Sequence, residues 1–155
     1  MRSNNEDSWK ILEEKQFFVL ADGVGGHNAG EVASTIAVES LCSSMQSLPE
    51  QPSVEEACLY LRRAVGVANA QILEKAKSDP LCKGMGTTLS CYLVLGKFLI
   101  YAHVGDSRLY RLRSELRQLT EDHSLRQQAR SGTAIAAPRN IITRALGTSA
   151  IVHPD

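Results

Sequence analysis

The spacing of apolar residues changes once along this chain, and that change limits the folds open to it. Between about residues 28 and 77, apolar side chains recur every three or four positions, as they do on one face of a helix. The pattern predicts two amphipathic helices, ending near Leu48 and Lys77, that pack as one layer. Ser53 and Glu56 have the spacing of a capping box, which is typical of a helix N-terminus.

Apolar residues after position 88 follow a period of two instead. Strands are expected over 89–95 and 98–104, with a tight turn between them, and a further hairpin over 107–119. Both sides of these strands are apolar, as in a sheet that is covered on both faces. An earlier strand is expected over 16–21. Helices followed by a run of strands favour an α+β fold over an alternating α/β fold.

Composition excludes several classes of function. The chain has 155 residues, enough for one domain, and carries 17 basic and 17 acidic residues. A protein that binds nucleic acid through its phosphates usually has a basic excess, so such a role is not expected. The chain has no apolar run of the ~20 residues that cross a membrane, and its start is polar and acidic. We therefore expect a cytoplasmic protein.

The four cysteines are not expected to carry chemistry. They form no C-x-x-C pair and lie within apolar patterns, which favours reduced, buried thiols over a zinc site or disulfides. They are Cys42, Cys58, Cys82 and Cys91.

Asp22 is the residue most open to a chemical role. It ends a predicted buried strand, and Gly23 begins a glycine-rich turn that runs to Gly30. A carboxylate next to exposed backbone carbonyls suits a hard cation such as Mg²⁺. A nucleotide-binding loop is a weaker alternative, because Asn28 stands where a third glycine is needed and Asp22 would repel phosphates. A purely structural turn is the third reading.

Other acidic positions are weaker signals by themselves. Glu6 and Asp7 form an acidic pair near Arg2, an arrangement that is most often a surface ion pair. Asp106 lies at a predicted turn, where aspartate commonly bonds its own backbone.

Taken together, these segments form a recognisable series. In chain order they read R-x-x-N-E-D, D-G-x-G-G-H-x-x-G-E-x-A, G-M-G-T-T, G-D-S-R-x-Y, L-T-x-D-H-S and I-T-R-A-L-G. The series resembles the metal-dependent serine/threonine protein phosphatases, the PPM or type 2C family, in their bacterial form. The resemblance extends from Arg2 to Asp155.

The resemblance implies a fold and a site. The fold is an α-β-β-α sandwich of two antiparallel sheets flanked by helices, with two Mg²⁺ or Mn²⁺ ions at one edge. Asp22 matches the carboxylate that bridges the metals, and Gly23 matches the residue that offers its carbonyl oxygen. Glu6 and Asp7 match a supporting acidic pair, and Asp106 matches a ligand of a third, weaker metal site.

The resemblance also implies a reaction. Arg2 matches the arginine that orients the substrate phosphate, and a metal-bridging water attacks phosphorus directly, so no cysteine nucleophile is needed. The substrates would be phosphoserine and phosphothreonine proteins, and the counterpart enzyme a Ser/Thr protein kinase. His27 is three residues beyond the position where some members have a catalytic histidine, here Val24, so a structural role is favoured for it, as for His103 and His123.

Departures from the family pattern lead to further expectations. The family continues beyond this point with two more metal-binding aspartates, in S-D-G and D-N motifs, whereas only Asp155 remains here after Ile142. The first strand is mostly absent before Arg2, and the flap segment 124–140 is short. We expect a single, incomplete domain over 1–155, of marginal stability or associating with another copy or a complementing fragment. The alternative function is a catalytically impaired binding or regulatory fragment with an incomplete two-metal centre.

Overall fold

The computed structural model describes residues 5–24, 29–130 and 141–155. Its main sheet is antiparallel throughout, with the strand order β1-β2-β4-β5 and a short strand, β3, paired to β2. These strands are β1 (Asp7–Leu12), β2 (Phe17–Val24), β3 (Gly86–Thr87), β4 (Leu89–Leu95) and β5 (Phe98–Val104). The expected strands at 89–95 and 98–104 are confirmed, and the expected strand at 16–21 is longer, reaching Val24.

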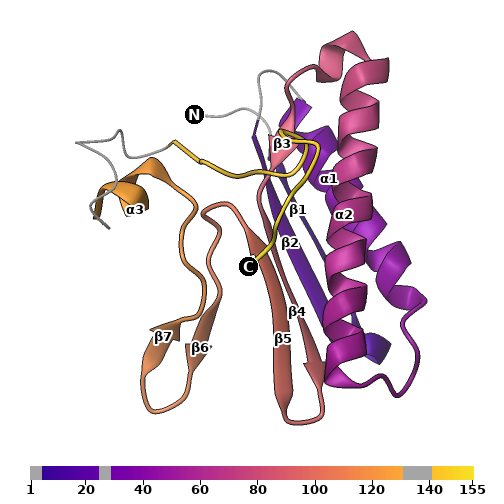
Figure 1. Ribbon diagram of the computed structural model, residues 1–155, viewed down its shortest axis with the longest axis vertical. Coiled ribbons are helices and arrows are strands. Elements are labelled where there is room, and N and C mark those ends of the chain that lie inside the picture. The colour runs from indigo at the N-terminus through magenta and orange to yellow at the C-terminus, as the bar shows by residue number, and fades with distance from the viewer. Residues whose placement is uncertain (1–4, 25–28, 131–140) are drawn as a thin grey trace.

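Two long helices cover one face of this sheet, as Figure 1 shows. They are α1 (Ala29–Gln46) and α2 (Val54–Ser78), so the single helical layer predicted from the apolar spacing is confirmed. The capping box before α2 is also confirmed: the Glu56 backbone N–H donates to Ser53 Oγ at 3.1 Å, and the Ser53 N–H donates to Glu56 Oε2 at 2.8 Å. Among the described residues, no helix is both long and apolar enough for a membrane span.

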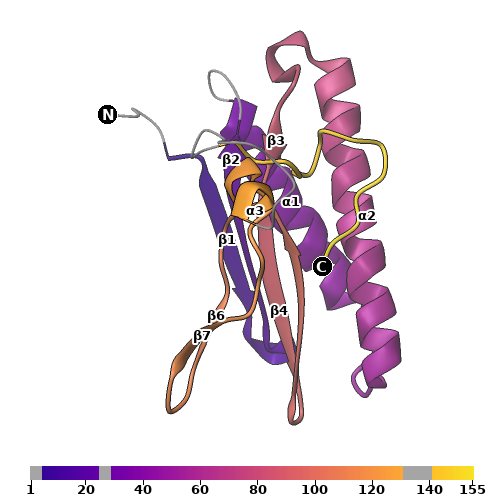
Figure 2. The same cartoon turned by 60° about the vertical axis from the view of Figure 1, so that its left-hand side comes forward.

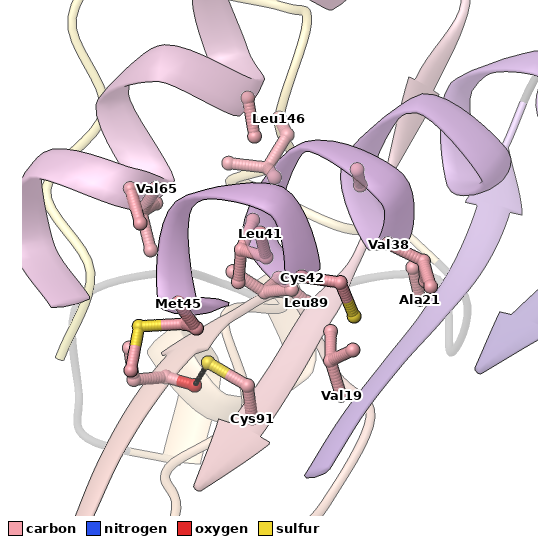
Figure 3. Close-up of a cluster of buried hydrophobic side chains, with 14 of the residues drawn as sticks. Val19, Ala21, Val38, Leu41, Cys42, Met45, Val65, Leu89, Cys91 and Leu146 are labelled. Carbon is pink, nitrogen blue, oxygen red and sulfur yellow. Dashed lines mark hydrogen bonds between the residues drawn. The ribbon is translucent and has the colours of Figure 1, made fainter. Parts of the chain in front are cut away.

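The core lies between the sheet and these helices. Figure 3 shows side chains of β2 facing α1, with Ala21 next to Val38 and Val19 next to Cys42. Strand β2 buries every second residue on this side, so Phe17, Val19 and Ala21 are all fully buried. Cys91 belongs to this core, and burial raises the pKa of its thiol to about 12, in agreement with the prediction that it is not a nucleophile. Of the other cysteines, Cys42 and Cys82 are buried, whereas Cys58 is exposed, so the prediction for Cys58 was wrong.

A smaller unit stands on the other side of the sheet. The hairpin β6 (Tyr110–Leu112) and β7 (Leu116–Gln118), with α3 (Leu125–Arg130), lies on the side away from α1 and α2 (Figures 1 and 2). Its strands pair antiparallel, which confirms the expected hairpin with shorter strands. Two 3-10 turns, η1 (Glu13–Lys15) and η2 (Pro80–Cys82), complete the described elements.

The sheet face opposite the helices is only partly covered. Register places Ile11, Phe18, Tyr92 and Tyr101 in one row across four strands, with Phe18 and Tyr92 stacked at 5.3 Å between ring centroids. Near β5, the Tyr101 hydroxyl donates to the Leu119 carbonyl, and the segment after β7 covers this part. At the β1 end, Trp9 is 64% exposed and Ile11 is 50% exposed.

Candidate metal centre

Strand pairing brings two predicted metal ligands directly opposite each other. Asp7 begins β1 and Asp22 lies near the end of β2, and the two are partners in the β1–β2 register. The Gly23 N–H donates to the Glu6 carbonyl at 3.0 Å, which makes Asp7 and Asp22 a pair without mutual backbone bonds. In such pairs the side chains lie on the same face and close together. Both carboxylates therefore project from the face opposite the helices.

The backbone of Asp22 is held from the other side by the G-M-G-T-T segment. Its N–H donates to Thr88 Oγ1 at 3.0 Å, and its carbonyl accepts from the Thr88 N–H at 2.9 Å and from Thr87 Oγ1 at 3.0 Å. Three hydrogen bonds thus fix the main chain that carries the carboxylate. Rigid backbone support of this kind orients a ligand before a cation arrives.

The G-D-S-R segment contacts the G-M-G-T-T segment through the side chains of Ser107 and Thr88. Thr88 Oγ1 lies 2.8 Å from Ser107 Oγ, and Gly105 packs so tightly on Thr88 that a Cβ there would lie 2.7 Å from the Thr88 methyl carbon. The φ angle of Gly105 is +108°, a backbone conformation that residues with a side chain rarely adopt. Asp106, half-exposed, lies between Gly105 and Ser107, so its position is set by contacts that converge on Asp22.

Two glycines allow the first turn of α1 to approach the strand ends. A Cβ at Gly23 would lie 2.1 Å from the Gly30 carbonyl oxygen, so only glycine fits there. A Cβ at Gly30 would lie 3.0 Å from the Glu6 carboxyl carbon, which places the Glu6 carboxyl group against the N-terminal turn of α1. A carboxylate in that position is stabilised by the helix dipole.

The predicted site residues are therefore partly assembled. Glu6, Asp7, Asp22 and Gly23 meet at one end of β1 and β2, and Asp106 is connected to them through Ser107 and Thr88. Arg2 and His27 lie outside the described residues. Within residues 5–24, 29–130 and 141–155, no three His, Cys, Asp or Glu side chains converge closely enough to hold a metal ion. Asp7 and Asp22 are nevertheless hard oxygen donors of the type that suits Mg²⁺ or Mn²⁺.

A second polar cluster, only part of which belongs to the sequence motifs, lies beside β5. His103 is fully buried, with Nδ1 3.3 Å from Ser90 Oγ and Nε2 3.2 Å from the Glu121 carbonyl. Burial, and the neighbouring His123, lower the pKa of His103. The prediction of a structural role fits these contacts.

His123 links this cluster to the last residue of the chain. Its Nδ1 accepts from the Gly105 N–H at 3.1 Å, so its Nε2 carries the proton and donates to Asp155 Oδ2 at 2.9 Å. Arg144 reaches Asp155 Oδ1 at 3.1 Å, and these side chains line a polar cavity of about 170 Å³. The histidine of L-T-x-D-H-S and the arginine of I-T-R-A-L-G thereby tie separate segments together.

Arg108 makes a further link that sequence reasoning did not identify. Its Nε and one terminal nitrogen donate to the two Asp122 oxygens at 2.8 and 2.6 Å, a bidentate ion pair. The pair fastens the base of the β6–β7 hairpin to the L-T-x-D-H-S segment. The motif spacing alone carries no signal that these two residues meet.

Comparison with known proteins shows the family to which the chain belongs. The family model described as protein phosphatase 2C matches residues 2–149. A serine/threonine phosphatase, stp, from Listeria welshimeri is 40% identical over 166 residues; the match covers 100% of this chain and 66% of that protein. The chain thus spans just under two thirds of the length of this relative.

Solved structures give the same result in three dimensions. The Mycobacterium tuberculosis serine/threonine phosphatase PstP/Ppp superposes with a TM-score of 0.86 at 36% identity, covering 100% of this chain and 66% of that one. The catalytic domain of PstP in complex with two manganese ions has a TM-score of 0.80 at 35% identity, covering 100% and 65%. The expected fold type is therefore confirmed.

Proposed function

Because this chain belongs to the protein phosphatase 2C family, we propose that the protein hydrolyses phosphoserine and phosphothreonine in other proteins, with Mg²⁺ or Mn²⁺ as cofactor. The observation that carries the proposal is the placement of Asp7 opposite Asp22 at one end of the sheet, beside Glu6 and Gly23. The relatives are named serine/threonine phosphatases, and one is solved with two manganese ions.

Each residue has a proposed part. Asp22 and Asp7 would hold the cations through carboxylate oxygens, and Gly23 would add its carbonyl oxygen. Glu6, whose carboxyl group lies against the first turn of α1, would support them. Asp106 would serve a weaker third cation, and Arg2 would orient the substrate phosphate. Bound cations would lower the pKa of water and neutralise phosphoryl oxygens.

The surrounding protein contributes position and charge. The three hydrogen bonds on the Asp22 backbone keep its carboxylate at the strand end, where it need not reorganise during the reaction. The partners would be phosphorylated proteins, with a Ser/Thr protein kinase as the opposing enzyme. We also propose a cytoplasmic location, a compartment in which free cysteines such as these four stay reduced.

The test is Mn²⁺-dependent release of phosphate from a phosphothreonine peptide, comparing the unchanged chain with Asp22→Asn. We expect the variant to lose at least about 100-fold in rate, because removing one charged ligand weakens metal binding and charge stabilisation together. Glu74→Gln, an exposed change on α2 away from the β1 edge, is the matched control and should leave the rate unchanged.

Absence of metal-dependent activity in the unchanged chain would contradict the proposal for this chain. It would support the alternative, in which the same scaffold serves as a binding or regulatory fragment with an incomplete metal centre. Manganese binding measured by calorimetry separates a lost metal site from a lost catalytic step.

A further inference from the structure

Strand β1 has an outer edge that is open to pairing. Among the described residues, β1 pairs with β2 alone. The hydrogen bond from the Gly23 N–H to the Glu6 carbonyl shows which residues of β1 bond to β2. Because bonded and non-bonded pairs alternate, the peptide groups of residues 8, 10 and 12 face β2. The peptide groups of Trp9 and Ile11 therefore point away from the sheet. Unpaired groups of this kind are a template for another strand.

A groove runs along this edge. It has a volume of about 370 Å³ and lies between Trp9 on one side and Thr35, Val38 and Glu39 of α1 on the other. Trp9 leaves 64% of its surface exposed, and Ile11 leaves 50%. Ser8 lies at the bottom of the groove and connects β1 to α1, because its hydroxyl lies 3.1 Å from Ser34 Oγ and 3.2 Å from Thr35 Oγ1. An extended chain laid here would contact apolar surface as well as free peptide groups.

The groove leads to the candidate metal centre. Asp7 lines its end and is also the residue opposite Asp22. The Asp7 N–H is taken by Asn5 Oδ1 at 3.1 Å. The next outward-facing peptide groups along the strand are those of Trp9 and Ile11, which continue directly from the metal end of the edge.

We propose that an extended segment of the phosphoprotein substrate adds to the edge of β1 as an antiparallel strand, with its phosphoresidue opposite Asp7. The inference rests on the proposed phosphatase function and assigns to it a substrate-binding surface. Antiparallel pairing continues the pattern of the whole sheet and is the more stable arrangement. It places the residues that precede the phosphoresidue beside Trp9 and Ile11.

The register of this antiparallel pairing predicts which substrate residues the protein prefers near the phosphoresidue. Residues opposite each other in an antiparallel pair project to the same face, so the phosphoresidue side chain would share the face of Asp7 and Asp22. The second residue before it would lie opposite Trp9 on that face. Cross-strand pairs of an aromatic with an aromatic or β-branched side chain are stabilising. We therefore expect a preference for such a residue at that position.

The test uses peptides that differ only in one backbone methyl group. Each carries a phosphonate that cannot be hydrolysed, no tryptophan, and N-methylation at either the first or the second residue before the phosphoresidue. Methylation at the second residue blocks the N–H that would bond to β1 and should weaken binding about tenfold. Methylation at the first residue faces solvent and should change affinity little. Equal affinities for the two peptides would overturn the proposal.

Trp9 is the only tryptophan of the chain, so its emission reports directly on the edge. Binding should shift its emission to shorter wavelength, and a bound peptide that leaves the emission unchanged would count against the proposal. Ile11→Pro removes an outward N–H and is compatible with an edge strand, whereas Ile11→Ala keeps that N–H. We expect the proline variant to bind about tenfold more weakly than the alanine variant, once circular dichroism shows that both are folded.

Hydrolysis of p-nitrophenyl phosphate separates the two proposals, because this small substrate has no peptide to pair with β1. If the chain hydrolyses it but binds both methylated peptides equally, the edge inference alone fails. If the chain does not hydrolyse it but still discriminates between the peptides, the proposed reaction fails and the binding surface stands.

Discussion

Gly23 and Gly66 have opposite environments, although both are single glycines within regular structure. A Cβ at Gly23 would meet the Gly30 backbone at 2.1 Å, whereas a Cβ at Gly66 in α2 would meet nothing within 4 Å. We expect Gly23→Ala to lower the free energy of unfolding by about 2 kcal/mol or more through overpacking. Gly66→Ala should raise it by about 0.5–1 kcal/mol, because alanine favours the helix. Urea denaturation measures both, and a neutral Gly23→Ala would mean that the strand end and α1 are not in close contact.

We expect His103 to make the stability of the protein depend on pH. Burial and the nearby His123 lower the pKa of His103 below its value in the unfolded chain, about 6.5. Its contribution to stability is complete above that unfolded value and is lost as pH falls through the folded pKa, because the unfolded chain binds the proton more readily. We expect His103→Asn to reduce the loss of stability between about pH 7 and pH 5. His153, which is exposed, is the control, and an equal change of slope in His153→Asn would contradict this role.

The chemistry of single residues was partly readable from the chain. Asp22 and Gly23 were candidates from local features, a buried strand end and a glycine turn, whereas Glu6 and Asp7 were assigned only through the resemblance to the family. The contacts of His103 with the Glu121 carbonyl and of Arg108 with Asp122 join positions 14 to 18 residues apart. Local patterns do not encode such contacts, because they depend on how the hairpin folds back over the sheet.

The start of α2 is stabilised by a complete capping box. Ser53 and Glu56 each accept a backbone hydrogen bond from the other. We expect Ser53→Ala to lower the free energy of unfolding by about 1 kcal/mol, because an N-terminal N–H of the helix loses its partner. Thermal denaturation measures this loss. Gln51→Ala, an exposed change two residues earlier, should have almost no effect in that measurement. Equal effects would mean that the cap is replaced by water without cost.

The elements differ in how well periodicity predicts them. Both helices and strands β4 and β5 are long enough to show their period, so their positions agree within a few residues. Strand β1 was not predicted, because Asp7, Trp9 and Lys10 mix polar and apolar residues in a polar segment. Strand β3 has two residues, too few for any pattern, and it forms only because β2 lies next to it.

At the level of the whole molecule, an apolar surface remains open in this chain. Val94 and Leu99 are cross-strand partners on the face opposite α1 and α2, 36% and 42% exposed. We expect the isolated chain to self-associate at micromolar concentration through this face, and Leu99→Lys to weaken the association about tenfold. Leu59→Lys on α2, where the leucine is 49% exposed on the other side of the sheet, is the control. Sedimentation velocity over a range of concentrations measures both, and a monomer at all concentrations would contradict the expectation.

The sequence alone determined the α+β class, the order of the main helices and strands, and the family, because apolar periodicity and short motifs are properties of neighbouring residues. Only the tertiary structure decided which of these residues meet. The β1–β2 register places Asp7 opposite Asp22, the hydroxyls of Thr88 and Ser107 join two motifs, and the outer edge of β1 leads to the same point. A shift of one residue in that register would turn the Asp7 side chain to the helical face. Pairing between strands far apart in the chain, rather than composition or local pattern, therefore assembles the candidate site.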